Sequence, residues 1–255
     1  MSNTVLAAQM YTLRKFTQTP ADIAATLKKV RAIGYRAIQI SAFGPCDPGE
    51  LAKMISGEGL AVCSTHTAWE RFVDEIDRVI DEHRLWGCTH PAIGGMPTQY
   101  RNAEGIATFA RLASDVGAKL AEAGMDFSYH NHNFEFTKAD GKTWLEILYE
   151  LSDPRYLKAE IDTYWVQAGG GDPADWVRRC AGRMPILHLK DMVMGPDGQR
   201  MAEIGEGNLN WPAILAAAKD AGVEWYCVEQ DDCYERDPFD SLKISLDNLH
   251  AMGLK

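Results

Sequence analysis

The 255-residue sequence predicts an α/β protein, a single-domain (β/α)8 TIM barrel over residues 1–255. Short apolar runs alternate with amphipathic stretches along the whole chain, and eight such pairs can be counted. The pairs repeat at roughly 25 to 35 residues, the length of a strand followed by a helix that crosses back to a parallel strand. Eight consecutive units of this kind favour a closed barrel.

The eight predicted strands are apolar runs that are short and rich in β-branched or aromatic residues. In chain order they are TVLAAQM (4–10), AIQISA (37–42), LAVCSTH (60–66), HPAIG (90–94), MDFSYHNH (125–132), LKAEIDTYW (157–165), PILHLKD (185–191) and VEWYCVEQ (223–230).

The predicted helices carry apolar residues at spacings of three and four, as at Ile23, Leu27 and Val30, and this stripe can cover a sheet. Asp or Pro opens several of them, and glycine closes nearly all. They span residues 21–34, 50–59, 70–87, 104–124, 143–152, 174–182, 211–222 and 240–253.

Two long stretches read as irregular, QAGGGDPAD (167–175) and MVMGPDGQRMAEIGEGNLN (192–210). Both follow strands, so in a barrel both lie over the carboxyl end, where barrel active sites are built. Their glycines either give loop flexibility or present backbone N–H groups to a phosphate. An open doubly wound sheet is the alternative fold, but AAQMYTLR after the first strand has no GxGxxG turn.

The composition and charge of the chain disfavour several classes of function. A net charge of -10 and a pI near 5.2 disfavour binding to nucleic acid, which requires clustered Lys and Arg. The six cysteines form no CxxC pair, the N-terminus has no signal-peptide pattern, and no apolar run reaches the roughly 18 residues of a membrane span. We expect a cytoplasmic enzyme with no membrane partner.

Ionisable residues gather at the ends of the last four strands. A lone histidine at a strand end is usually hydrogen-bonded and structural, so the argument depends on the set as a whole. Parallel strands bring their carboxyl ends to one edge, and the set offers the nitrogen and oxygen ligands of manganese, magnesium, cobalt or zinc. The residues are His130, His132 and Glu135; Glu160 and Asp162; His188, Lys190 and Asp191; and Glu229, Asp231 and Asp232.

Several segments resemble the sugar phosphate isomerase/epimerase superfamily with the xylose isomerase-like TIM barrel, which also contains inosose dehydratases, ketose 3-epimerases and endonuclease IV. The resemblance covers essentially the whole chain and is strongest in VLAAQMYTLR, YHNHNFEF, AEIDTYW, ILHLKDM, EIGEGNLNW and YCVEQDD. It implies one divalent metal ion, manganese first, held by four residues on the last four strands.

By motif, the resemblance places Asp162, His188 and Glu229 among the metal ligands. For the strand-five ligand we favour Glu135, because a carboxylate suits a hard cation, with direct ligation by His130 as the alternative. His130, His132 and Glu229 are then the catalytic candidates. The substrate-binding candidates are His66, Trp69, Tyr164, Trp165, Lys190 and Glu206.

The resemblance implies a sugar isomerase or epimerase that abstracts the α-proton of a keto-sugar through a metal-stabilised enediolate. A dehydratase or β-eliminating lyase acting on inosose or 3-keto-glycosides shares the early steps and is the alternative. An endonuclease IV-like repair enzyme and a non-catalytic sugar-binding barrel are further alternatives. The expected partner is a small-molecule sugar, and a homo-oligomer is compatible with the sequence.

Overall fold

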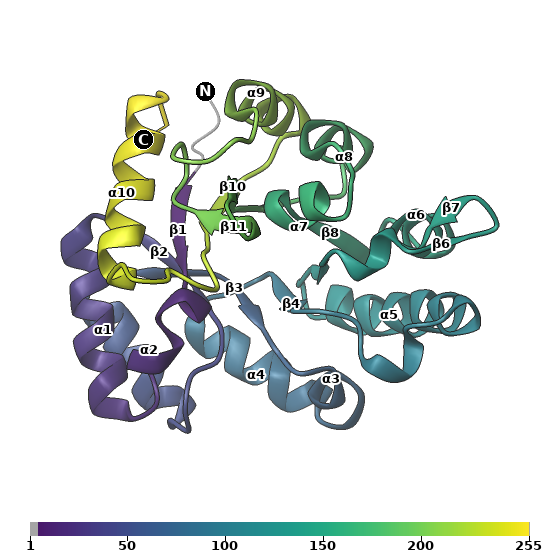
Figure 1. Ribbon diagram of the computed structural model, residues 1–255. Coiled ribbons are helices and arrows are strands. Elements are labelled where there is room, and N and C mark those ends of the chain that lie inside the picture. The colour runs from purple at the N-terminus through teal and green to yellow at the C-terminus, as the bar shows by residue number, and fades with distance from the viewer. Residues whose placement is uncertain (1–4, 255) are drawn as a thin grey trace.

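A computed structural model describes residues 5–254 and shows a closed barrel of eight parallel strands (Figure 1). Thr4, where the first strand was predicted to begin, lies outside the described residues. The order around the barrel is β1-β12-β9-β8-β5-β4-β3-β2, and β1 pairs with both β12 and β2. The strands are β1 (Val5–Gln9), β2 (Ala37–Ile40), β3 (Ala61–His66), β4 (Pro91–Ile93), β5 (Phe127–His130), β8 (Leu157–Asp162), β9 (Ile186–Leu189) and β12 (Trp225–Val228).

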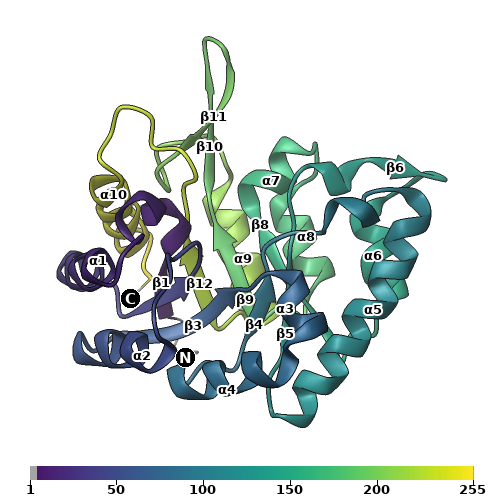
Figure 2. The same ribbon diagram turned by 90° about the horizontal axis from the view of Figure 1, so that it is seen from below.

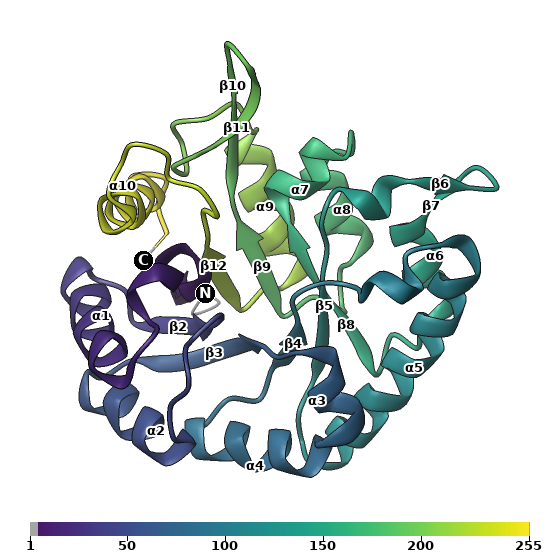
Figure 3. The same ribbon diagram turned by 60° about the horizontal axis from the view of Figure 1, so that its bottom comes forward.

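Helices surround the barrel (Figure 3) and bury their apolar stripes against it, as Ile23, Leu27 and Val30 show. The helices are α1 (Pro20–Ile33), α2 (Pro48–Gly57), α3 (Trp69–Asp74), α4 (Ile76–Trp86), α5 (Ala103–Glu122), α6 (Trp144–Leu151), α7 (Thr163–Ala168), α8 (Pro173–Arg179), α9 (Trp211–Ala221) and α10 (Pro238–Ala251). Three short 3-10 helices are η1 (Met10–Phe16), η2 (Thr98–Tyr100) and η3 (Phe134–Phe136). The predicted fold class and the eight strands are confirmed.

Local sequence sets where the helices begin. Pro20, Pro48, Pro173 and Pro238 each occupy the first turn, where a missing N–H costs no hydrogen bond. In each case the preceding Thr or Asp accepts a hydrogen bond from a backbone N–H of the first turn. Within residues 5–254, no helix combines the length and the apolar character needed to cross a membrane.

Two predicted boundaries are wrong. The helix predicted over residues 70–87 is broken at Glu75, which has φ -134° and separates α3 from α4. The sixth strand ends at Asp162 rather than Trp165, because the Asp162 side chain caps a new helix by accepting from the Trp165 backbone N–H. The residues Thr163 to Trp165 have β-type side chains, which favoured the strand in the sequence.

The stretch predicted as irregular over 192–210 contains a hairpin, formed by β10 (Asp191–Gly195) and β11 (Gly198–Ala202). Figure 2 shows this hairpin extending away from the barrel. Pro196 and Asp197 followed by Gly198 form its turn, a turn signal that the sequence analysis did not use. A second, small hairpin joins β6 (Lys138–Ala139) to β7 (Lys142–Thr143).

The barrel interior is layered, because alternate residues of a strand point inward. One layer is small and apolar and consists of Ala7, Ala37, Cys63, Ile186 and Cys227. Two residues further along β9, after Ile186, comes His188, and two further comes Lys190. The same period of two places Asp162 after Glu160 and Glu229 after Cys227, so the polar residues gather towards the carboxyl end.

Candidate metal centre and pocket

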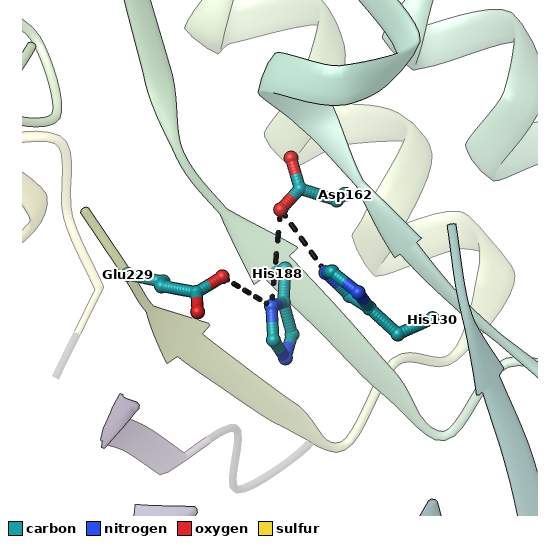
Figure 4. Close-up of side chains that lie close together, drawn as sticks. All are labelled: His130, Asp162, His188 and Glu229. Atoms are coloured by element: carbon teal, nitrogen blue, oxygen red, sulfur yellow. Dashed lines mark hydrogen bonds and ion pairs between the residues drawn. The ribbon is translucent and has the colours of Figure 1, made fainter. Parts of the chain in front are cut away.

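Four side chains converge at the carboxyl end of the barrel (Figure 4). They are His130 of β5, Asp162 of β8, His188 of β9 and Glu229, which follows β12, and all four are buried. One ligand-type atom from each lies within 4.8 Å of the others. His130 Nε2 is 3.2 Å from Asp162 Oδ2, and His188 Nδ1 is 3.0 Å from Glu229 Oε2. Together these four side chains could hold one ion.

The orientation of His130 supports a cation at this point. Its Nδ1 lies 3.2 Å from the Gly94 carbonyl oxygen, which can only accept, so Nδ1 carries the hydrogen. Burial and the nearby His188 lower the pKa of His130, which favours the neutral ring. The lone pair on Nε2 then faces the Asp162 carboxylate, and a cation between these two acceptors would make the contact favourable. The residues present therefore fit a divalent metal ion.

Asp162 serves two purposes with its two oxygens. Oδ1 accepts from the Trp165 backbone N–H at 2.9 Å and so caps α7. The backbone N–H of Asp162 donates to Asn131 Oδ1, and this hydrogen bond holds the end of β8 beside the residue that follows β5. Oδ2 is left facing the centre, so the fold orients this carboxylate before any ion binds.

His188 Nδ1 faces Glu229, while Nε2 faces the barrel interior. Burial alone lowers the pKa of His188, but the carboxylates of Glu160 and Glu229 outweigh it and raise the pKa to about 10. Without a metal ion the ring therefore holds a proton between two carboxylates. A cation bound at Nδ1 would take the place of that proton.

Lys190 is a second positive group at the centre, beside His188. Its Nζ lies 3.1 Å from Asp162 Oδ2, 2.7 Å from Glu229 Oε2 and 3.1 Å from Asp231 Oδ1. Burial lowers its pKa, but the three carboxylates raise it well above the usual range, so the ammonium is retained. Lys190 offsets the charge of carboxylates that would otherwise repel one another.

Glu135, the favoured strand-five ligand in the sequence analysis, is not among the converging residues. It is buried, and its Oε1 accepts from the Tyr129 hydroxyl while Oε2 accepts from the His132 backbone N–H at 2.9 Å. Burial raises its pKa to about 7, with the Tyr129 hydroxyl acting in the opposite direction. The geometry favours the alternative, His130, because Glu135 holds the loop after β5 instead.

A pocket of about 410 Å³ opens over the centre. Besides residues of the centre, its wall includes Tyr11, Ser41, His66, His132, Trp165 and Asp231. The volume suits a small sugar, and the wall mixes aromatic faces with charged groups. Lys190 Nζ lies 5.4 Å from the centre of the Trp165 ring, which closes one side.

The family of this barrel follows from a comparison of sequences. The family model for the xylose isomerase-like TIM barrel matches residues 27–251. The chain belongs to this family. A curated relative, the inosose dehydratase of Geobacillus kaustophilus (strain HTA426), is 25% identical over 190 residues, which are 65% of this chain and 61% of that protein.

Solved structures of other proteins share the fold. A sugar phosphate isomerase/epimerase from Parabacteroides distasonis ATCC 8503 superposes with a TM-score of 0.84 at 23% identity, over 100% of this chain and 96% of that one. An L-ribulose 3-epimerase gives 0.74 at 17% identity, over 97% and 94%. At these identities the likeness is one of fold.

Among the substrate-binding candidates, His66, Trp165 and Lys190 line the pocket of this xylose isomerase-like barrel. Trp69 is part of the core, where its ring packs against Phe109 and Phe127. Tyr164 is buried edge-on against Trp165, outside the pocket wall.

Glu206 lies on the exposed loop after β11, and its Oε1 accepts from Asn248 Nδ2 at 3.1 Å. It borders a different surface hollow from the one over the centre. The position of this loop could not be read from its glycine-rich sequence, because the loop is folded by a long-range contact with Asp191.

The sequence analysis noted Asp231 but did not select it as a site residue. Asp231 lies in the pocket wall, and burial together with Glu229 raises its pKa to about 6. His132 also lies in the wall, and burial and His130 lower its pKa to about 3, so its ring is neutral. The spacing of Asp231 two residues after Glu229 was the available signal, since alternate residues face the same side.

Proposed function

We propose that the chain is a divalent-metal-dependent isomerase or epimerase that removes the proton next to the carbonyl of a keto-sugar. The observation that carries this proposal is the convergence of His130, Asp162, His188 and Glu229 beneath a pocket of sugar size. These four residues would hold the ion, with His130 in place of Glu135. The two carboxylate oxygens suit manganese and magnesium, and the two imidazole nitrogens suit transition metals such as zinc and cobalt, so manganese, which accepts both kinds of ligand, is the first candidate.

A metal ion bound by these residues would polarise the substrate carbonyl and stabilise negative charge on its oxygen. Lys190 offers an ammonium in the pocket wall that can donate to a substrate hydroxyl. Trp165 offers a ring face on which the apolar face of a sugar can stack. These groups would orient the substrate before any proton moves.

Asp231 and His132 are the pocket groups that metal binding leaves free. A carboxyl with a pKa of about 6 can both accept and return a proton near neutral pH, so Asp231 is the proposed base. His132 follows β5 and Asp231 follows β12, with β8 and β9 between them, so they approach the pocket from different sides. Asp231 can remove a proton at one atom and, once protonated, return it at another, while the neutral ring of His132 can hydrogen-bond to a substrate hydroxyl.

A dehydratase or β-eliminating lyase is the second candidate. A single glutamate, Glu229, stands among the four converging residues, and His130 occupies the position facing it. The site therefore has no pair of glutamates to exchange a proton symmetrically across the substrate. The similarity to an inosose dehydratase also supports an elimination reaction. Here Asp231 would take up the α-proton and pass it to the departing hydroxyl, which leaves as water.

Incubation in heavy water separates these outcomes. Ketohexoses, inosose and 3-keto-glucosides would each be tested with manganese, magnesium, cobalt and zinc. We expect deuterium at the carbon next to the carbonyl of the true substrate, with an isomeric product for isomerisation and loss of water or of the glycosidic group for elimination. Absence of both exchange and any new product with every substrate and metal would contradict both candidates.

The matched variant is Asp231→Asn, which keeps all four proposed ligands. General acid–base catalysis contributes about 100- to 10,000-fold, so exchange should slow by at least about 100-fold while metal content is unchanged. Equal exchange rates in the variant and the wild type would remove Asp231 from the mechanism. Incision of abasic DNA is not expected, because the chain carries a net charge of -10.

A further inference from the structure

A network of buried polar side chains lies directly beneath the centre, inside the barrel. Gln39 of β2 and Glu160 of β8 are fully buried and reach across the interior to the inner side of His188. His188 Nε2 lies 2.6 Å from Gln39 Oε1 and 2.5 Å from Glu160 Oε1. No step of the proposed reaction uses either residue.

Glu160 determines which way the Gln39 amide points. Gln39 Nε2 lies 2.7 Å from Glu160 Oε1 and 3.1 Å from the hydroxyl of Ser64. The same oxygen accepts from His66 Nε2 at 2.9 Å, because Gln9 Nε2 donates to the other ring nitrogen of His66. Glu160 Oε1 is therefore an acceptor, and the NH2 group of the Gln39 amide must face it.

The amide orientation in turn determines the hydrogen on His188. With its NH2 group facing Glu160, Gln39 presents its carbonyl oxygen to His188 Nε2. Both groups near Nε2 are then acceptors, so Nε2 must carry a hydrogen. Nδ1 is the nitrogen on the other side, 3.0 Å from Glu229 Oε2 and 3.9 Å from Asp162 Oδ2.

We propose that Glu160 and Gln39 are positioning residues that hold the hydrogen of His188 on Nε2 and thereby commit Nδ1 to the metal ion. Metal-bound imidazoles usually donate their other N–H to a carboxylate or carbonyl, which fixes the ring and strengthens the ligand. Here the two kinds of acceptor act together, with the carboxylate aligning the amide. The inference rests on the metal site of the proposed function.

The Glu160 carboxylate also accepts a hydrogen bond from the ring of His66. Gln9 Nε2 lies 3.2 Å from His66 Nδ1, and the Gln9 carbonyl accepts from the Tyr11 backbone N–H, so Nδ1 of His66 accepts. His66 Nε2 then donates to Glu160 Oε1 at 2.9 Å. Both nitrogens of His66 are engaged, so this residue presents its ring rather than a base to the pocket.

A charge swap tests the positioning pair. Glu160→Gln keeps the shape but lets either end of the new amide face Gln39, so the Gln39 amide is free to turn. Adding Gln39→Glu to Glu160→Gln restores an obligatory acceptor at His188 Nε2, with the NH2 group of the amide introduced at position 160 beside it. The control is Glu82→Gln, the same change at a buried carboxylate that pairs with Arg71 and Arg78 on the outer face.

Two readouts are used on each protein. The first is Mn²⁺ affinity by titration calorimetry. The second is the ring N–H proton of His188, observed by NMR after 15N-histidine labelling in the metal-free protein, where activity plays no part. Glu160→Gln should weaken Mn²⁺ binding by roughly 10- to 100-fold and broaden or shift the Nε2–H signal. The double variant should recover both, and Glu82→Gln should change neither.

An unchanged Nε2–H signal with wild-type affinity in Glu160→Gln would overturn the proposal. So would a double variant that folds, by its circular dichroism and melting temperature, without recovering either readout. If the wild-type protein binds none of the four metals, the proposed function fails, yet the NMR readout still reports whether Glu160 and Gln39 accept the hydrogen bond from Nε2–H of His188.

Discussion

Two buried carboxylates, Asp162 at the end of β8 and Asp191 at the start of β10, differ in what surrounds them. Asp162 Oδ2 faces His130, His188 and Lys190, which are ionisable groups. Asp191 Oδ1 and Oδ2 accept only from neutral N–H groups, those of Met192, Gly205, Gly207, Leu209 and the Trp211 indole. The Asp162 carboxylate could therefore bind a cation in place of a proton. Both oxygens of Asp191 already accept hydrogen bonds from N–H groups.

The comparison explains the glycines of the EIGEGNLNW loop. Gly205 has φ +87°, and a Cβ at Gly207 would lie 2.4 Å from Asp191 Oδ1. Their backbone N–H groups bind the Asp191 carboxylate, so within the described residues this loop is not available as a phosphate cradle. A buried carboxylate surrounded by backbone donors is a structural anchor, whereas one surrounded by histidine and lysine is a candidate ligand.

The largest expected effect is that of Asp191→Asn. An asparagine amide accepts hydrogen bonds through one oxygen instead of two, so several of these N–H groups lose their acceptor. Each buried N–H left without an acceptor costs about 1–3 kcal/mol of stability. The free energy of unfolding should fall by about 4 kcal/mol in urea titrations, and Mn²⁺ should not restore it. Recovery with Mn²⁺ would mean that Asp191 belongs to the metal centre after all.

Lys190→Met should have a smaller effect of a different kind. Removing the ammonium leaves Asp162, Glu229 and Asp231 facing one another, which should lower the free energy of unfolding by about 3 kcal/mol without metal. A divalent cation supplies the missing positive charge, so the difference from wild type should shrink as Mn²⁺ is added. A difference that Mn²⁺ leaves unchanged would argue against a cation site between these carboxylates.

A buried histidine with neutral partners extends the comparison. His83 Nδ1 donates to the Val79 carbonyl at 2.7 Å, and Nε2 accepts from the Thr65 hydroxyl at 2.8 Å. Burial lowers its pKa to about 4, the opposite of His188 beside its carboxylates. The two carboxylate partners of His188, Glu160 and Glu229, therefore account for the opposite direction of its pKa.

The smallest predicted effect follows from His83. Because its folded-state pKa lies below the unfolded value of about 6.5, its contribution is complete above pH 6.5 and is lost as the pH falls towards 4. Between pH 7 and pH 5 the loss should be about 2 kcal/mol. His83→Gln should flatten the dependence of unfolding free energy on pH by that amount, and parallel curves for both proteins would contradict the assignment.

The sequence was sufficient to predict the barrel. The spacing of apolar residues that marks a strand or a helix depends only on residues nearby in the chain. The sequence also indicated Asp162, His188 and Glu229 as polar residues at strand ends, and the structure brings these three side chains together; their role as metal ligands stays a prediction. It was not sufficient to choose between His130 and Glu135, since that choice depends on the Tyr129 hydroxyl, which occupies Glu135 within the fold.

Long-range contacts account for the other differences. Trp69 follows a strand end but turns into the core against Phe109, which no local pattern indicates. Glu206 was predicted to bind the substrate because its loop follows a strand. In the structure, the loop is held by hydrogen bonds to Asp191, and Glu206 contacts Asn248. Glu160 was visible as a charged residue, but its contacts with Gln39 cross the barrel from β8 to β2.

The most direct measurement is the metal content of purified wild-type protein and of four alanine variants, at His130, Asp162, His188 and Glu229, by elemental analysis. Glu135→Gln serves as the matched control. We predict close to one divalent ion per wild-type chain, its loss from all four alanine variants and its retention in Glu135→Gln. No ion that binds the wild type, even after manganese, magnesium, cobalt or zinc is added, would contradict the metal centre, and retention in His130→Ala with loss in Glu135→Gln would return the fourth position to Glu135.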